Sequence, residues 1–354
     1  MRSALASAVL ALSFRPGLTV AAAPTAPRVG GPAPVLAGAR WLKGPEVPSW
    51  EKGKVYVLDI WAPWCGPCLG GMQHLTDLQR ENASRGLVVV GMTGPDEYGT
   101  TLDAARQTVA KKGAAIGYSI AWDDDHRLYD IWMARERGAG WPWCFVIGRD
   151  GRVAFVGHPE RLDAVIEPIL SGTYDIASAT RSYDRRIQAL ALASQYSSAR
   201  RSGRWREAAD IFGRLLATDR GVAGPYVPID YKVLAIELRD PVLAASFGRD
   251  MVRRFADDPD PLVALAEVIV DPAIPLAPRD FELATLCAER ADAATGHTRA
   301  GLATVLARVY FAAGRIQQAI DAQQRAVALA DESDREGARQ TLARYVAAGG
   351  DARR

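Results

Sequence analysis

The chain of 354 residues contains only four cysteines, too few for a scaffold held together by disulfide bonds. Its 43 Lys and Arg residues nearly balance its 41 Asp and Glu residues, and the net charge of +2 gives no electrostatic case for nucleic acid or anionic lipid as a partner. No segment has the roughly 20 uninterrupted apolar residues of a membrane-spanning helix. These absences favour a globular protein that does not cross a membrane, and the length favours two or three domains.

The first residues predict export. Residues 1–23 combine Arg2, an apolar run and a patch of small residues, a pattern typical of a secretory signal peptide, although Arg15 cuts the apolar run short. An Ala- and Pro-rich leader or a misplaced start codon is the alternative interpretation. Residues 24–38 are rich in Pro, Gly and Ala, and we expect a linker there. The predicted location is therefore periplasmic or secreted.

Two regions of different character follow. Residues 39–172 alternate between strand and helix patterns, which predicts an α/β domain with a central mixed sheet. Its expected elements are strands at 55–61 and 87–92, helices after Cys68, over 101–112 and over 161–170, and a β-hairpin that turns at 149–151. Residues 173–184 are predicted to form a second linker, residues 185–348 an all-α domain, and residues 349–354 a tail.

The all-α region carries a spaced pattern of small residues. Ala208 follows Gly203 by five positions, and Ala319 follows Gly314 by the same interval. Small residues at these offsets allow antiparallel helices to pack closely, as in tetratricopeptide-type hairpins. We expect two to four such hairpins that stack as one cooperative unit and bind a peptide or protein partner.

The motif "DIWAPWCGPC" carries the chemistry. Cys65 and Cys68 are spaced C-x-x-C at a predicted strand-to-helix junction, where the first helical N–H groups and the helix dipole favour a thiolate at Cys65. Cys68 lies one turn further on, and we expect it to be shielded beneath an accessible Cys65. Gly66 and Pro67 allow a tight entry into the helix. The expected cofactor is none beyond the redox-active Cys65–Cys68 pair.

Other residues are predicted to complete this site. Asp59 lies in an apolar strand, where burial should raise its pKa and suit it to proton transfer with Cys68, unless it is a satisfied structural carboxyl. Pro142 follows a Gly-rich loop and is a candidate for a cis peptide bond after Trp141. We expect Trp64, with Gly66, Pro67 and Trp141, to contact a bound substrate.

The motif, the "GWP" loop and the segment "GRDGRVAFVGHPERLDAVIEPIL" together resemble the thioredoxin superfamily, and more narrowly the TlpA/ResA-like thiol-disulfide oxidoreductases. The resemblance covers about 33–172, with 99–133 as that family's additional strand and helix. It implies that Cys65 attacks, Cys68 resolves, Asp59 is the buried acid and Pro142 is the cis-proline. Trp141 and the absence of a lysine in the strand at 87–92 depart from the superfamily pattern.

Several alternatives stay open. Zinc needs four ligands, and Cys144, Cys287 and the scattered histidines lack the spacing, so no metal is expected. Cys144 is interpreted as a buried apolar residue or an additional redox thiol, and Cys287 as core. The first functional hypothesis is a reductase of protein disulfides, supplied by an upstream electron donor. An oxidase or isomerase is the second, and an interaction scaffold with a secondary redox module is the third.

Overall fold

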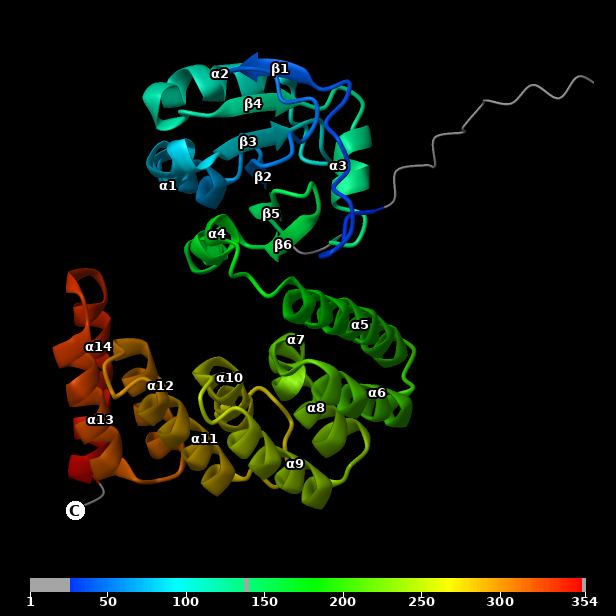
Figure 1. The fold of residues 1–354 in the computed structure, drawn as a ribbon. Coiled ribbons are helices and arrows are strands. Elements are labelled where there is room, and N and C mark those ends of the chain that lie inside the picture. The colour runs from blue at the N-terminus through cyan, green and yellow to red at the C-terminus, as the bar shows by residue number, and fades with distance from the viewer. Residues whose placement is uncertain (1–25, 137–139, 352–354) are drawn as a thin grey trace, which may run out of the picture. The chain divides into compact units, whose positions relative to one another are not determined.

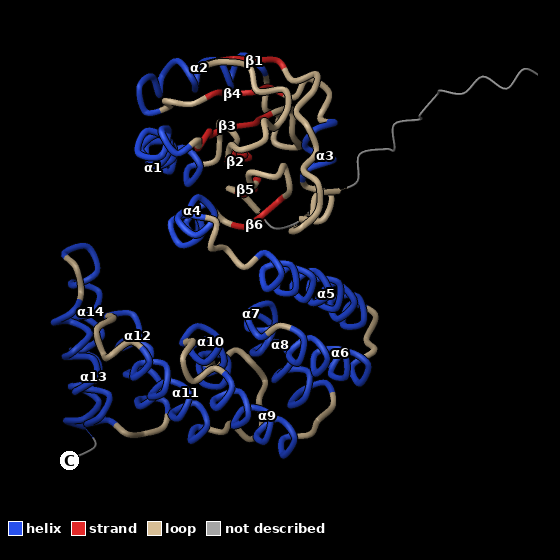
Figure 2. The backbone as a smooth tube through the Cα atoms, viewed as in Figure 1, coloured by secondary structure: helices blue, strands red, loops and turns tan. Residues whose placement is uncertain are grey.

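The computed structural model of the protein describes residues 26–136 and 140–351. The chain divides into two compact units, with the boundary between Tyr183 and Asp184. The predicted signal peptide lies outside the described residues. Figure 2 shows the described strands confined to the first unit, whereas the second unit is helical throughout its regular elements. The predicted combination of an α/β domain with an all-α region is confirmed.

The first unit is built on a six-stranded mixed sheet with the order β1-β4-β3-β2-β5-β6 (Figure 1). Strands β2, β3 and β4 are parallel, whereas β1 pairs with β4, β5 with β2 and β6 with β5 in the antiparallel sense. The strands are β1 Arg40–Lys43, β2 Val55–Ile60, β3 Leu87–Thr93, β4 Ser119–Trp122, β5 Trp143–Ile147 and β6 Val153–Gly157. The helices are α1 Gly66–Asn82, α2 Leu102–Lys112, α3 Arg127–Trp132 and α4 Leu162–Ser171, with 3-10 turns η1 Ala83–Arg85, η2 Gly113–Ala115 and η3 Pro159–Arg161.

Strand β2 is central because both of its faces are covered. All of its residues are buried, as the continuous apolar run predicts. Val55 and Val57 belong to the apolar cluster that includes buried residues of α1, α2 and α4. Successive side chains alternate between the faces of a sheet, so Asp59 shares the face of Val57. The sequence therefore places a carboxyl group in the apolar layer beneath α1.

The segment before β1 was predicted to be a linker, but its described part is bound to the sheet. Gly30 N donates to Val153 O at 2.8 Å, and Val153 N donates to Gly31 O at 2.9 Å. Leu36 is fully buried. Strand β6 lies at the end of the sheet, and these bonds pair backbone groups on its outer side. A free linker would leave those groups without a partner from this segment.

The second predicted linker, residues 173–184, is also largely wrong. Helix α5, Ile176–Arg201, begins inside it and continues past the boundary between the units. Asp175 begins this helix, because its carboxylate accepts a hydrogen bond from Ser178 N at 2.9 Å. Most of the predicted linker therefore lies in the first turns of a capped helix.

The second unit is a succession of helices in which α10 to α14 each contact the next helix along the chain. Its described helices after α5 are α6 Trp205–Thr218, α7 Arg220–Ala223, α8 Val227–Lys232, α9 Pro241–Arg254, α10 Pro259–Val270, α11 Phe281–Ala294, α12 Ala300–Ala312, α13 Ile316–Leu329 and α14 Glu332–Asp351, with short η4 Gly224–Tyr226 and η5 Val233–Glu237. Ala208 and Ala319 are fully buried, whereas Gly203 and Gly314 lie in the turns between helices with φ of +66° and +74°. Helix α14 also covers residues 349–351 of the predicted tail, and the rest of the tail lies outside the described residues. Nearest-neighbour packing of this kind is typical of helical-repeat proteins.

Candidate active site

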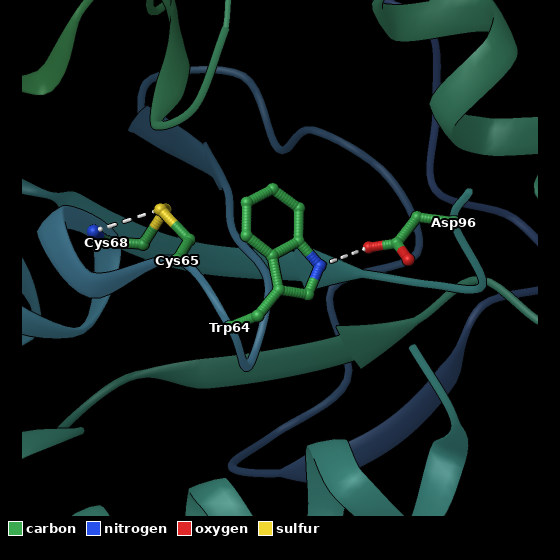
Figure 3. Close-up of a disulfide and its surroundings, with 4 residues drawn as sticks. All are labelled: Trp64, Cys65, Cys68 and Asp96. Atoms are coloured by element: carbon green, nitrogen blue, oxygen red, sulfur yellow. Dashed lines mark hydrogen bonds between the residues drawn. A yellow bond between two sulfur atoms is a disulfide. The ribbon is translucent and has the colours of Figure 1, made fainter. Parts of the chain in front are cut away.

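Cys65 and Cys68 form a disulfide bond at the N-terminus of α1. Cys65 is the N-cap residue, with φ −78° and ψ 96°, and Cys68 N donates to Cys65 Sγ at 3.2 Å (Figure 3). Pro67 occupies the first turn, where its missing N–H leaves no helical bond unmade. Once the disulfide is reduced, this helix end would favour a negative charge on Cys65 Sγ.

The expected contrast in exposure between the two cysteines is wrong for the disulfide-bonded form. Cys65 and Cys68 are each only 3% exposed, and both belong to the apolar cluster of the first unit together with Trp61 and Ala62. The physical reason is that the bond joins the two sulfur atoms within one apolar cluster at the start of α1, so both are covered by the same neighbours. Exposure therefore does not distinguish the two sulfur atoms here.

The two cysteines differ in their position relative to a cavity of about 330 Å³. Its lining includes Cys68, Asp59 and Pro142 but not Cys65. The other lining residues come from α1 and from the segment after β6: Pro67, Gly71, His74, Leu75, His158, Pro159 and Glu160. The cavity brings together the buried acid, the second cysteine and the cis-proline, three of the four predicted catalytic residues.

Asp59 is the buried acid that the sequence predicts. It is 2% exposed, and within the described ranges its carboxyl group makes no hydrogen bond. Burial raises its pKa from 3.8 to about 7, which confirms the predicted direction and its cause. Its strand neighbours are Gly91 in β3 and Cys144 in β5. A carboxyl group with this pKa can both accept and release a proton near neutral pH.

The peptide bond between Trp141 and Pro142 is cis, as predicted. Pro142 lines the cavity directly before β5 begins. The Trp141 ring lies 5.7 Å from the Trp64 ring and stacks on Tyr129 at 5.5 Å. Trp141 thus belongs to an aromatic surface that also carries Trp64.

Trp64 is 43% exposed beside the disulfide, in agreement with the prediction of an exposed contact residue. Figure 3 shows its indole directed toward Asp96, and Trp64 Nε1 donates to Asp96 Oδ2 at 2.7 Å. Burial alone would raise the pKa of Asp96, but hydrogen bonds from Thr100, Trp64 and Tyr98 outweigh it and lower the pKa. Tyr98 packs on Trp64 with ring centroids 4.5 Å apart. An ionised carboxylate therefore fixes the orientation of the ring beside the disulfide.

Sequence reasoning missed Asp96 and two histidines of the cavity, His74 and His158. The Pro-Asp pair at 95–96 could have indicated a turn, because Asp96 Oδ1 accepts from Tyr98 N as Asp residues in turns do. The sequence analysis considered the histidines only as scattered residues without metal-ligand spacing, and no pattern pointed to His74 or His158. Both histidines reach the cavity only through the packing of α1 against the segment after β6.

The remaining cysteines are buried. Cys144 is fully buried in β5, where its Sγ donates to Gly157 O at 3.2 Å and burial raises its pKa well above the ordinary value. Cys287 is fully buried in α11, and burial raises its pKa to about 12. Both observations agree with the interpretation of these residues as core. Asp123, in the acidic run before α3, accepts a hydrogen bond from Tyr129 N at the start of that helix.

Comparison with known proteins places this unit. Residues 41–156 match the model of the AhpC/TSA family. The first unit is an AhpC/TSA-type thioredoxin-like domain. The chain is 25% identical over 149 residues to the protein FixW of Rhizobium leguminosarum. This alignment covers 41% of the present chain and 67% of FixW. It is also 28% identical over 127 residues to the thiol:disulfide interchange protein HelX of Rhodobacter capsulatus. That alignment covers 35% of the present chain and 65% of HelX.

Among solved structures, a thiol:disulfide interchange protein of the thioredoxin family from Chlorobium tepidum TLS is 25% identical, with a TM-score of 0.34, and the match covers 40% of this chain and 96% of that one. None of these matches extends over the majority of the present chain. The family match and the disulfide together identify the first unit as belonging to the thiol-disulfide oxidoreductases of the thioredoxin fold. Among the described residues, no helix is both long and apolar enough to span a bilayer.

Proposed function

We propose that the protein reduces disulfide bonds of other proteins outside the cytoplasm, with Cys65 and Cys68 as its redox couple. The observation that carries the proposal is the disulfide between Cys65 and Cys68 at the N-terminus of α1, with a buried acid of pKa about 7 on the same cavity as Cys68. Such a pair can cycle between disulfide and dithiol without a bound cofactor.

The reaction begins from the dithiol form. The Cys65 thiolate attacks one sulfur of the substrate disulfide, a mixed disulfide forms at Cys65, and the other substrate sulfur leaves as a thiolate. Cys68 then attacks Cys65 Sγ, which releases the second substrate sulfur and restores the Cys65–Cys68 disulfide. The substrate gains two electrons and the protein loses two.

Asp59 serves the second step. Cys68 must lose its proton before it attacks, and Asp59 lines the same cavity, which has room for water between the two groups. A carboxyl group with a pKa of about 7 can accept that proton near neutral pH and release it again afterwards. Asp59 therefore acts as the proton acceptor for Cys68.

The substrate contacts the aromatic surface beside the disulfide. Trp64 is exposed there and is held in place by Asp96. Gly66 and Pro67 are exposed next to it at the start of α1, and Trp141 leads into the cis-proline. In this arrangement the backbone next to Pro142 offers an edge to an extended substrate segment, as in strand addition.

Reduction is the proposed direction because a C-G-P-C sequence is typical of reducing members of the superfamily, with thioredoxin itself near −270 mV. The same couple would run as an oxidase or isomerase at a higher potential. Equilibration of the protein with glutathione redox buffers measures this potential. A value near that of thioredoxin supports a reductase, and a value above about −180 mV, the potential of protein disulfide isomerase, would identify an oxidant.

Export and partner binding complete the proposal. The leader-like composition of residues 1–23 supports a periplasmic or secreted location, where protein disulfides occur. The helical second unit supports partner binding, because stacked helical repeats present extended binding surfaces. An upstream electron donor must then return the disulfide to the dithiol form.

The test is a trap for substrates. In Cys68→Ser the mixed disulfide at Cys65 cannot be resolved, so substrates should stay covalently bound and be released by dithiothreitol. Cys65→Ser/Cys68→Ser is the matched control. If the double variant retains the same partners, the scaffold hypothesis is favoured over the enzyme. If the reduced wild type also fails to reduce insulin in a turbidity assay, the proposed activity is wrong.

A further inference from the structure

The second unit contains a cavity of about 490 Å³ that has a buried carboxyl group among its lining residues. Asp230 of α8 and Leu234 of η5 line it together with residues of α6 and α9, two helices that both contact η5. The apolar lining residues of α6 and α9 are Ala209, Phe212, Leu216, Ala217, Leu243, Phe247 and Met251. A cavity of this size with apolar walls and a few polar groups can hold a side chain of a partner.

One oxygen of the Asp230 carboxyl group is free to accept a hydrogen bond. Asp230 is 2% exposed, and its Oδ1 accepts a hydrogen bond from Tyr196 OH at 3.3 Å. Oδ2 accepts no hydrogen bond from the described residues, yet it is not among the enclosed polar atoms without a partner, which include Arg200 Nε. The small exposed area of Asp230 therefore includes this unpartnered oxygen.

Two of the three carboxylates that line the cavity have no cation bonded to them. Arg253 and Arg254 are the cationic lining residues, and both bond to Asp250, at 3.0 Å and 2.6 Å. In the described part of the chain, neither Asp210 nor Asp230 forms an ion pair with a basic side chain. The lining therefore has acceptors for a positive charge that the protein itself does not supply.

Arg200 of α5 does not take this role at Asp230. Its guanidinium lies over the Tyr196 ring, 5.6 Å from the ring centroid. Burial raises the pKa of Asp230 to about 7, and this effect exceeds the lowering by the Tyr196 hydrogen bond and by the Arg200 charge. Asp230 is thus a buried acid without a cation to hold it ionised, and a bound cation would stabilise its charged form.

We propose that this cavity binds a lysine side chain of a protein partner, with the ammonium group on Asp230 and the aliphatic stem against the apolar walls. A lysine can bury its stem along apolar surface while its head group stays charged. Because Tyr196 already bonds to Oδ1, the one free oxygen suits the point charge of an ammonium group better than the fork of a guanidinium. The inference rests on the partner binding proposed for the second unit and names the side chain that is recognised.

Affinity for the lysine should increase with pH, because the ionised carboxylate is the form that attracts an ammonium group. With a pKa of about 7, the ionised fraction of Asp230 rises about tenfold between pH 6 and pH 8. The other titratable groups around the carboxyl group and the cavity are Tyr196 and Arg200 on α5, Asp210 on α6, and Asp250, Arg253 and Arg254 on α9. No histidine is among the described residues that line the cavity. Asp230 is therefore the group to which this dependence is assigned.

The experiment uses the oxidised full chain and the rhodamine-labelled peptide Gly-Leu-Ala-Lys-Ala-Leu-Gly. Fluorescence polarisation measures its Kd at pH 6 and pH 8, and we expect about tenfold tighter binding at pH 8. Two matched peptides carry norleucine or arginine in place of the lysine. Norleucine should weaken binding at pH 8 at least about tenfold, because it keeps the stem and lacks the charge, and arginine should weaken it several-fold.

Two variants assign the effect to one carboxyl group. Asp230→Asn keeps the shape of the side chain and removes its charge, so it should weaken binding of the lysine peptide about tenfold at pH 8 and abolish the dependence on pH. Glu237→Gln is the matched control, because Glu237 is an exposed residue of η5 that does not line the cavity. It should change the affinity less than twofold. Circular dichroism melts check that both variants fold.

The wild type alone can overturn the inference. It would do so by failing to bind the lysine peptide, by binding it equally at pH 6 and pH 8, or by binding the norleucine or arginine peptide as tightly. Unchanged affinity in a folded Asp230→Asn protein would also overturn it. The peptides contain no cysteine, whereas insulin reduction requires the Cys65–Cys68 couple and no lysine peptide, so failure of this inference and failure of the proposed activity are distinguishable.

Discussion

Replacement of Asp59 by Asn should stabilise the first unit, and the gain should depend on pH. The carboxyl group is 2% exposed, and its pKa in the folded protein is about 7 against 3.8 for an ordinary aspartate. Between these two values the unfolded chain is ionised at this position, whereas the folded protein still holds the proton. The unfolded state thus binds fewer protons, and the free energy of unfolding falls as the pH rises.

The magnitude follows from the shift. A difference of about three pKa units at 1.36 kcal/mol per unit corresponds to about 4 kcal/mol. Asn keeps the shape of the side chain and cannot ionise, so the variant avoids this loss. We expect Asp59→Asn and the wild type to differ least near pH 4, to diverge by up to about 1.4 kcal/mol per pH unit, and to keep a constant difference above pH 7.

Urea denaturation of the oxidised protein from pH 4 to pH 9 measures the difference. Tryptophan fluorescence reports on the correct unit, because every tryptophan except Trp205 lies before residue 184. Asp230→Asn is the control, since burial also raises the pKa of Asp230 to about 7 but in the second unit. A constant difference between Asp59→Asn and the wild type over this pH range would refute the reasoning, because it would mean that Asp59 titrates alike in the folded and unfolded chains.

Four further substitutions test the site and the helical unit. Asp96→Ala should free the Trp64 ring from its hydrogen bond and lower kcat/KM for a protein disulfide several-fold, with a change in Trp64 fluorescence as the structural readout. Gly314→Ala should lower the stability of the second unit by about 1 kcal/mol, because the backbone φ of +74° at this position is unfavourable for Ala. Gly337→Ala within α14 should raise the stability by a similar amount, because Ala favours a helix more than Gly does. Chemical denaturation followed by far-UV circular dichroism measures both changes. Cys144→Ala should leave the pattern of trapped mixed disulfides unchanged in the Cys68→Ser background, and loss of those adducts would instead assign Cys144 a redox role.

The features that the sequence could predict are those set by neighbours along the chain. A continuous apolar run specifies β2, and the Asp150-Gly151 turn specifies the β5–β6 hairpin. The strand-to-helix junction before Gly66 and Pro67 places Cys65 at the helix N-terminus, and the C-x-x-C spacing puts Cys68 about one helical turn further on. The raised pKa of Asp59 was also predictable, because a carboxyl group in an apolar strand is desolvated wherever that strand is buried.

The features that escaped prediction depend on segments far apart in the sequence. His74 and His158 meet at one cavity only because α1 packs near the segment after β6. Asp96 reaches Trp64 across 32 residues, and no local pattern pairs an aspartate with an indole at that separation. The equal burial of the two cysteines depends on packing in the apolar cluster of the first unit, which brings together residues far apart in the sequence.

The position of Cys65 at the helix N-terminus and the cavity beside Cys68 correspond to the two steps of the proposed exchange. The first N–H groups and the dipole of α1 favour a thiolate at Cys65, so Cys65 is the nucleophile that meets the substrate. Cys68 then attacks Cys65 Sγ in the mixed disulfide, and Asp59 lines the same cavity as Cys68 and takes its proton. The surroundings of the two cysteines therefore differ in the way that their two proposed roles require.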